Sequence, residues 1–356
     1  MLPRPTGESP SLLNTVGGRN FTPLLRNTLH MVRIIARWTT IASTIMACAF
    51  ALAAGAQDSR PKKKKSGSAP AASKWQDKEL GGLVRSYAQN HRVDLALMNG
   101  LEALPVEAPG PKYRNNSKEY FEKAVLGAGG VFHDSGPFRF IVPESPLYGP
   151  LTRYSLTGRI DPGYAGVNAT LQIGSGTPIY NALALLGYVL DRTIIADNTI
   201  ADQPTGEIGL FDVPMTGAIE AILKSARVPE EAFAVLSTKE FILIHSPATA
   251  PKIRDTATMP DYLSRRMSLT LPTPTLNERQ FPASEVMPLH AVLASLARQL
   301  EVPVEVDRSL RDLPVTPMHM SRVTIATALD LLLAQWPVND IAIDTTAERI
   351  IVRPAE

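Results

Sequence analysis

The sequence has 356 residues, of which 44% are hydrophobic, so it can bury the cores of two or three ordinary domains. The formal net charge of +2 is unevenly distributed: residues 1–56 carry five arginines and one glutamate, and residues 57–78 have a net charge of +5. Residues 79–356 therefore have a net charge of −7. This acidic balance opposes phosphate binding and argues against a nucleic-acid-binding protein.

The first 56 residues are expected to lie outside the folded part. Residues 1–30 contain Pro, Gly and Ser without periodicity and are interpreted as disordered or as a mis-assigned start, with Met1 and Met31 as alternative initiators. Residues 31–56 have the order of a secretory signal peptide, with arginines, an apolar run and then small residues. The apolar run is about 14 residues long, shorter than the roughly 20 that span a bilayer, which makes a retained anchor the less favoured alternative.

The only cysteine, Cys48, lies inside the predicted signal peptide. A mature chain would therefore have no disulfide, no cysteine metal site and no cysteine nucleophile; a lipoprotein anchored through Cys48 is the alternative. Residues 57–78 are interpreted as a basic linker, because they offer too little apolar surface to fold. Four consecutive lysines lie in it: Lys62, Lys63, Lys64 and Lys65. They are either a solvated run or a weak contact with anionic lipid or cell-wall polymer.

A pattern of mostly apolar residues recurs at a fixed shift of 110 positions. The first occurrence comprises Pro178, Leu183, Ala184, Leu186, Leu190, Asp197, Val213, Ala218 and Ile219. The second comprises Pro288, Leu293, Ala294, Leu296, Leu300, Asp307, Val323, Ala328 and Leu329. All pairs but the last are identities. Agreement that holds across two helical patterns and the strands between them indicates an internal repeat.

Residues 166–246 predict one small unit of helices and strands. Its elements follow in the order strand, helix, strand, strand, helix, strand, strand, at residues 167–173, 178–190, 193–196, 206–213, 214–223, 233–236 and 241–244. The strands alternate or are β-branched, and the helices have apolar residues at helical spacing. Pro178 is suited to the first turn of its helix, and Thr216 is expected to cap the second one.

Residues 266–354 predict the same order of elements. These are expected at residues 267–271, 288–300, 302–306, 315–320, 324–333, 341–344 and 350–352, with Thr324 as the cap of the second helix. A more degenerate copy at residues 79–145 lacks the opening strand, and Ser117 is expected to cap its second helix. Each unit has about 75 residues, which is marginal for independent stability, so packing between units or with partner subunits is expected to contribute. The connectors 145–165 and 247–266 are expected to be extended linkers.

The two clearer units resemble the short N-terminal (STN) domain shared by secretins and TonB-dependent transducers. The resemblance rests on Pro178–Asp197 with Val213–Ile244, and on Pro288–Asp307 with Val323–Val352. It implies an α+β fold of tandem small domains, each with two helices packed on small mixed β-sheets (βαββαββ), and docking to periplasmic partners. It implies no catalytic residues. Because the sequence ends at Glu356, we expect no secretin barrel to follow.

No metal or cofactor site is predicted. The six histidines are scattered and lack the His-x-x-x-His spacing of a helical metal site: His30, His91, His133, His245, His290 and His319. Met318-His319-Met320 is the one cluster of soft ligands. On a strand Met318 and Met320 share a face and His319 points the other way, so the two methionines are interpreted as core residues and not as a copper site.

No catalytic residue is predicted either. Asp197 and Asp307 could do acid–base work, but both follow a strand, and each is expected to bond the backbone of the next turn. The stretch Gly127-Ala128-Gly129-Gly130 has the glycines of a nucleic-acid clamp. It follows a helix and enters a strand, so it is interpreted as a helix C-terminus.

These features favour a non-enzymatic, periplasmic protein–protein interaction module, an accessory or docking component of a secretin, pilus or other envelope transport complex. Association with the outer membrane and self-association are left open, as are the partner and the oligomeric state. The alternative is a cell-wall or small-ligand binding protein, or an enzyme, with a site at a repeat junction. The connector that contains Tyr148, Tyr154 and Tyr164 is the first place to look for such a site.

Overall fold

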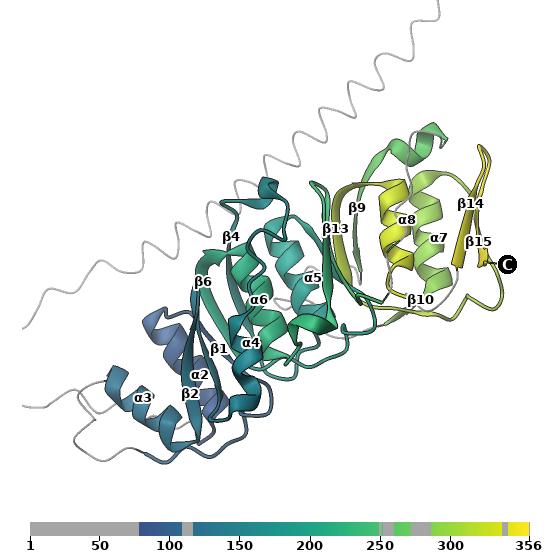
Figure 1. The fold of residues 1–356 in the computed structure, drawn as a ribbon. Helices are drawn as coiled ribbons and strands as arrows, with labels where there is room; N and C mark the ends of the chain where they lie inside the picture. Colours follow the sequence, from purple (N-terminus) through teal and green to yellow (C-terminus); the bar gives the residue numbers. More distant parts are fainter. Residues whose placement is uncertain are drawn as a thin grey trace, which may run out of the picture. The chain divides into compact units, whose positions relative to one another are not determined.

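The computed structural model describes residues 78–108, 117–248, 251, 260–271, 286–336 and 341–355. The predicted start segment (1–30), the signal peptide (31–56) with Cys48, and the basic linker apart from Lys78 lie outside the described residues. Figure 1 shows that the described residues form helices and small sheets. They contain seven α-helices and several small mixed sheets, so the predicted α+β class is confirmed.

Residues 79–145, the first segment, contain two helices and three strands. They are α2 (Leu80–His91), β1 (Leu95–Leu97), α3 (Ser117–Gly127), β2 (Gly130–Ser135) and β3 (Phe138–Pro143). α2 has Leu80, Leu83 and Val84 on one face, and all three are buried. The helix ends at Arg92, whose φ of 51° is in the left-handed region that stops a helix.

Residues 166–246, the second segment, follow the predicted order. The elements are β4 (Asn168–Ile173), α5 (Ile179–Leu190), β5 (Thr193–Ala196), β6 (Ile208–Pro214), α6 (Met215–Ser225), η5 (Glu230–Ala232), β7 (Ala234–Ser237) and β8 (Phe241–His245). The predicted cap at Thr216 is wrong: α6 begins after Pro214, without a side-chain cap. The N–H of Met215 instead donates to Val167 O at 2.8 Å, so a backbone carbonyl takes the place of the cap.

Residues 266–354, the third segment, also follow the predicted order, with two added two-residue strands, β10 and β12, and are preceded by η7 (Asp261–Ser264). The elements are β9 (Arg266–Leu271), β10 (Met287–Pro288), α7 (Leu289–Leu300), β11 (Val304–Val306), β12 (Pro314–Val315), β13 (Met318–Thr324), α8 (Ile325–Leu333), β14 (Ile341–Thr345) and β15 (Ile350–Pro354). The predicted cap at Thr324 is confirmed, since its hydroxyl accepts from Thr327 N at 3.1 Å. α7 and α8 lie between the β13–β9 pair and the β14–β15 hairpin (Figure 1).

The largest sheet contains strands from two segments. Its order is β2-β3-β1-β6-β4, so three strands of the first segment adjoin two strands of the second. β1 runs parallel to β3 and antiparallel to β6, with Leu95 opposite Gly209. The first and second segments therefore share one sheet.

The remaining strands form a three-stranded sheet in the second segment, β5-β8-β7, and three sheets in the third, β13-β9, β11-β15-β14 and β10-β12. α5 and β5 of the second segment both contact β13. The buried hydrophobic residues fall into two clusters, one across the first and second segments and one mainly in the third. Ile195, Phe241 and Leu243 belong to the second segment but pack in the third-segment cluster.

The connectors differ from the extended linkers that were expected. Residues 145–165 form η3 (Pro146–Tyr148), α4 (Gly149–Arg153) and η4 (Pro162–Tyr164). They bury Tyr154 and Leu156, the latter completely. The described part of the second connector buries Leu263 in η7. The abundance of Pro and Gly suggested linkers, but single apolar side chains between them anchor both connectors to the core.

Candidate functional site

Equivalent backbone features recur in the three segments and allow residues to be compared between them. One bridge precedes the first helix of each segment: Glu79 with Pro105, Pro178 with Pro204, and Pro288 with Pro314. Left-handed residues end the same three helices: Arg92, Asp191 and Glu301, with φ of 51°, 51° and 57°. In this part of the fold, the first segment therefore precedes the second by 99 positions, and the second precedes the third by 110.

The same backbone hydrogen bond connects the first segment to the second and the second to the third. At the first junction the N–H of Asn99 donates to Ser225 O at 2.8 Å. At the second junction the N–H of Asn198 donates to Gln335 O at 2.9 Å. In both cases the donor lies just after the strand that follows the first helix of one segment. The acceptor is the last residue of α6 at the first junction and lies two residues after α8 at the second.

A second equivalent contact joins the start of a short strand to a bulge in the next segment. Asp94 Oδ1 accepts from Phe211 N at 2.6 Å, and Thr193 Oγ1 accepts from Ser321 N at 2.8 Å. β6 and β13 each have a register shift at this point. A bulge leaves one N–H outside the strand ladder, and here a side-chain oxygen of the neighbouring segment accepts it.

An apolar sheet face completes each junction. In the first segment Ala96, Phe138 and Phe140 are buried, and α6 of the second segment packs against their strands. The equivalent residues of the second segment are Ile195, Phe241 and Leu243, which pack in the third-segment cluster. Each junction thus combines a turn amide, a bulge amide and a buried apolar face.

The third segment has a different set of residues on the equivalent face. Ile195, Phe241 and Leu243 correspond to Glu305, Arg349 and Ile351, because β11 and β15 pair as β5 and β8 do. Glu305 and Arg349 form an ion pair at 3.2 Å, and both side chains are about half exposed. The face that buries a neighbour in the first two segments is therefore charged in the third.

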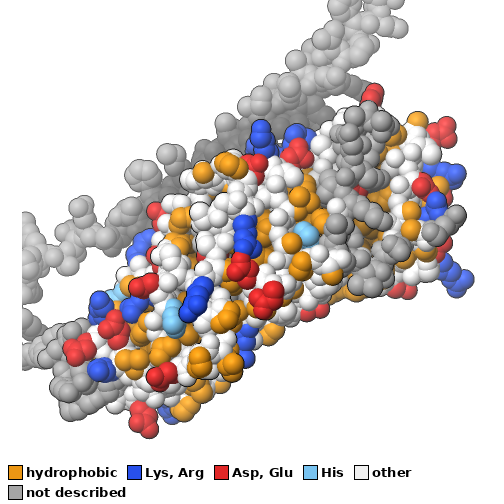
Figure 2. Space-filling model, in the orientation of Figure 1, with side chains coloured by type: hydrophobic (Ala, Val, Ile, Leu, Met, Phe, Trp, Pro, Cys, Tyr) orange, Lys and Arg blue, Asp and Glu red, His pale blue; other side chains and the backbone are white. Residues whose placement is uncertain are grey.

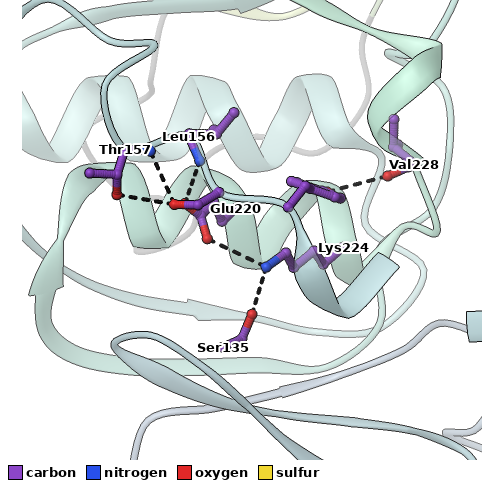
Figure 3. Close-up of polar contacts among 8 residues, drawn as sticks. Ser135, Leu156, Thr157, Glu220, Lys224 and Val228 are labelled. Atoms are coloured by element: carbon purple, nitrogen blue, oxygen red, sulfur yellow. Dashed lines mark hydrogen bonds and ion pairs between the residues drawn. The ribbon is translucent and has the colours of Figure 1, made fainter. Parts of the chain in front are cut away.

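A buried lysine and glutamate form a polar network at the first junction. Figure 3 shows Lys224 extending from α6 toward Ser135, at the end of β2, and Glu220, one turn earlier on α6. Lys224 Nζ lies 2.6 Å from Ser135 Oγ and 3.5 Å from Glu220 Oε2. Lys224 is 1% exposed and Glu220 is 4% exposed. Two charges at this depth need partners of opposite charge and further hydrogen bonds.

The first connector supplies those further hydrogen bonds. Glu220 Oε1 accepts from Leu156 N at 2.6 Å (Figure 3). It also accepts from Ser155 Oγ at 2.9 Å. The ring of Tyr154 lies 4.7 Å from Lys224 Nζ, a cation–π distance. The network therefore holds the connector, the first segment and α6 together.

The same residues have one chemical feature in common with an enzyme. A serine hydroxyl within hydrogen-bond distance of a lysine amine can be activated when the amine is neutral. Burial lowers the pKa of Lys224, while Glu220 opposes that shift. Ser135, however, is only 5% exposed. The geometry therefore favours a structural ion pair that fixes the junction.

A second polar cluster lies at the second junction and includes His319. Its Nδ1 lies 2.9 Å from Thr270 Oγ1, and its Nε2 lies 3.9 Å from Asp191 Oδ1. The ring packs edge-on against Tyr188 of α5, with the centroids 5.5 Å apart. Burial lowers the pKa of His319, with Asp191 acting in the opposite direction. The pKa of Asp191 is lowered chiefly by a hydrogen bond from Ser321 and further by nearby positive charge.

The predicted core position of Met318 and Met320 and the predicted backbone hydrogen bonds of the two aspartates are confirmed. Met318 and Met320 are buried in the third-segment core, and His319 points toward Tyr188 instead. Asp197 bonds the backbone N–H groups of Thr199 and Ser246, at 3.0 and 2.7 Å. Asp307 accepts from Ser309 N at 2.8 Å. Both carboxylates therefore stabilise turns, and they lie in separate segments.

The remaining residues singled out in the sequence do not come together. Gly127 ends α3 and Gly130 begins β2, as a helix C-terminus requires. Of the three connector tyrosines, Tyr154 alone contacts the Lys224 network. Burial raises the pKa of Tyr164 to about 12, and its hydroxyl has no hydrogen-bond partner among the described residues. The histidines other than His319 lie on separate elements, and His30 lies outside the described residues.

Sequence reasoning missed the residues that form the junctions. Asp94, Thr193 and Glu220 do not belong to the pattern that recurs at 110 positions, because the junctions conserve geometry with different side chains. A sequence signal exists for Glu220 alone: Glu220 and Lys224 lie one helical turn apart in a mostly apolar helix.

Comparison with protein-family models, with curated proteins and with solved structures gives no match. None of the helices in the described part of the chain has the length and apolarity needed to cross a bilayer. On the face drawn in Figure 2, basic and acidic side chains lie interspersed among hydrophobic ones.

Proposed function

We propose that this chain is a non-enzymatic protein–protein interaction module of the periplasm. It acts as an accessory or docking component of a secretin, pilus or other envelope transport complex, and it is exported by the signal peptide at residues 31–56. The resemblance of residues 166–245 and 281–353 to STN domains supports a role in such a complex.

The observation that carries this proposal is the shared construction of the two junctions. In each junction, one segment contributes a turn amide, a side-chain acceptor and an apolar face. These contact a bulged strand and the end of a helix in the next segment. A fold that recognises strand–helix units in this way has the parts needed to bind a similar unit, or a single added strand, from another protein.

Crosslinking of the full chain in its native host tests the proposal. The protein, tagged at its C-terminus, is crosslinked in intact cells and purified, and bound proteins are identified by mass spectrometry. We expect it in the periplasmic fraction, linked to a component of an envelope transport complex. An unrelated exported protein with the same tag is the control. Recovery of an uncrosslinked monomer, or of the same proteins with the control, would refute the proposed role.

One observation favours the enzyme alternative, namely the distance of 2.6 Å between Ser135 Oγ and Lys224 Nζ. A serine-reactive phosphonate distinguishes the two functions. An enzyme predicts labelling of Ser135 that disappears in Lys224→Met, because the amine is required to activate the hydroxyl. The interaction proposal predicts no labelling of the folded chain, because the hydroxyl is buried.

A further inference from the structure

One edge of the five-stranded sheet lacks the residues that usually protect a sheet edge from pairing. β4 is an end strand and, within the described residues, pairs only with β6. Its six residues, Asn168–Ile173, include no charged residue and no proline. The opposite end strand, β2, contains Asp134, and the end strands of the β11-β15-β14 sheet contain Glu305 and Asp344. The end strands β5 and β7 also lack charged residues and proline, but they are shorter than β4, with four residues each, and β5 contacts β13. Charged residues and proline are the usual means by which an edge avoids pairing with another strand, and β4 lacks both.

The side chains of β4 alternate between the two faces of the sheet and do not point along its edge. Ala169, Leu171 and Ile173 are buried beneath the sheet. The exposed side chains are held over their own face: Thr170 Oγ1 accepts from Asp212 N at 3.1 Å, and Gln172 Oε1 accepts from the side-chain amide of Gln89 at 3.0 Å.

The backbone register shows which groups of β4 face outward. Leu171 lies opposite Leu210, and Ile173 lies opposite Ile208. The carbonyl of Glu207 and the N–H of Phe211 face the first segment, so Ile208 and Leu210, which alternate with them, face β4. The N–H and C=O groups of Thr170 and Gln172 therefore point away from β6.

We propose that β4 pairs antiparallel with β4 of a second copy of this chain, around a two-fold axis at Thr170. In this register Thr170 lies opposite Thr170 of the partner subunit, and Asn168 lies opposite Gln172 of the partner subunit. Threonine pairs and amide pairs are favourable across antiparallel strands, and no like charges meet. The exposed and buried faces of the two sheets also stay in register, because side chains alternate with period two.

The dimer is a reversible one. A pair of six-residue strands buries much less than the roughly 1,200 Å² at which specific stable interfaces begin. Self-association therefore depends on protein concentration. This inference rests on the proposed interaction function, but its test uses the purified chain alone and does not need the envelope partner.

Two matched lysine substitutions test the pairing by sedimentation velocity over a range of concentrations. Thr170→Lys places two like charges at the axis and is expected to give a monomer. Ser268→Lys is the control on β9: Ser268 Oγ accepts from Arg322 N at 3.1 Å, as Thr170 Oγ1 accepts from Asp212 N. Both variants lose the same bond to a bulge amide, so only the first should lose the dimer. A monomeric wild-type chain, or equal loss of the dimer in both variants, would overturn the proposal.

A crosslinking measurement keeps the test decisive if Thr170→Lys does not fold. In a Cys48→Ser background the chain contains no cysteine, so Thr170→Cys introduces its one thiol. A short bifunctional thiol reagent is expected to link two copies through this position and not through Ser268→Cys. Equal crosslinking at both positions, or none at Thr170→Cys, would contradict the two-fold pairing. If the purified chain dimerises but crosslinking in cells finds no envelope partner, this inference is supported and the proposed role is refuted. The failure of one can therefore be distinguished from the failure of the other.

Discussion

The backbone N–H of Ser321 donates to Thr193 Oγ1 at 2.8 Å across the second junction. Thr193 is completely buried, and Ser321 is 7% exposed. The same place at the first junction is taken by Asp94 and Phe211, with a distance of 2.6 Å. A neutral hydroxyl and a carboxyl oxygen thus do the same task, which is to accept the amide that each bulge leaves outside the strand ladder.

Removing the hydroxyl of Thr193 should weaken the second junction. Thr193→Val keeps the shape of the side chain but leaves Ser321 N–H buried without an acceptor. An unsatisfied buried donor costs about 1–3 kcal/mol, so we expect a loss of that size in the free energy of unfolding, measured with urea.

Thr193→Ser is the matched control, because it keeps the oxygen and removes only a methyl group. It should retain most of the stability that Thr193→Val loses. If the two variants were equally destabilised, packing of the methyl group and not the hydrogen bond would account for the effect.

Removing one partner of the ion pair at the first junction should destabilise the fold more than removing both charges. Lys224→Met leaves the buried carboxylate of Glu220 without its cation, and breaking a buried pair in this way typically costs about 3–5 kcal/mol. We expect the lower end of that range, because Leu156 N and Ser155 Oγ still donate to Glu220.

The double variant Glu220→Gln/Lys224→Met should recover most of that loss. The amide oxygen can still accept from Leu156 N, and no charge remains buried. A double-mutant cycle by chemical denaturation measures the coupling between the two residues. Additive losses would mean that the two side chains stabilise the fold independently.

The α+β class and most element positions could be predicted from sequence because apolar periodicity determines which faces are buried. The helix that follows Pro178 and the strand at 193–196 depend on local pattern, and they formed as predicted. The prediction of a cap at Thr216 was wrong because a tertiary hydrogen bond, from Met215 N to Val167 O, determines where α6 begins. The prediction of extended connectors was wrong because a few buried residues such as Leu156 anchor them to the core, although Pro and Gly are abundant in them.

The junctions could not be predicted for a different reason. Their main hydrogen bonds involve backbone groups, such as Asn99 N and Ser225 O, which do not require a particular residue type at those positions. Where a side chain takes part, two chemically different residues serve, as Asp94 and Thr193 do. Composition and periodicity describe each segment, whereas a junction depends on how two segments pack.

Stability should fall on mild acidification because of His319. Its pKa is lowered in the folded state by burial, so near the ordinary value of about 6.5 the folded chain binds fewer protons at this site than the unfolded chain. The stability that neutral His319 contributes to the folded state is therefore fully present above about pH 6.5 and is lost as the pH falls toward the folded pKa. Asp191 lies 3.9 Å from the ring and favours its protonated form, while Arg322 pairs with Asp191 at 3.5 Å.

The pH effect is isolated by comparison with His319→Gln, which cannot titrate. The free energy of unfolding of wild type minus that of the variant should decrease between about pH 7.5 and pH 5.5. The ordinary carboxyl groups affect both proteins alike and cancel in the difference. An unchanged or increasing difference would show that the Asp191 carboxylate, and not burial, controls the titration of the ring.

The charged face of the third segment should prevent the chain from stacking further units at that end. Glu305 and Arg349 occupy the positions of Ile195 and Phe241, whose apolar side chains are buried by the next segment. In stacked folds, a unit face that no neighbouring unit covers usually needs to be polar for solubility. Glu305→Ile/Arg349→Phe places the apolar residues of the second segment, Ile195 and Phe241, at the equivalent positions of the third. We expect this exposed apolar surface to increase self-association in sedimentation experiments.

The reciprocal substitution places the ion pair inside the molecule. Ile195→Glu/Phe241→Arg would bury two charges against the third segment, where the cost of desolvation commonly exceeds the attraction between them. We expect a loss of at least about 3 kcal/mol in the free energy of unfolding, similar to that of a large core truncation. If the chain tolerated this change, or if Glu305→Ile/Arg349→Phe stayed as monodisperse as wild type, the two faces would be interchangeable. The polar face would then not limit the packing of another unit against this surface.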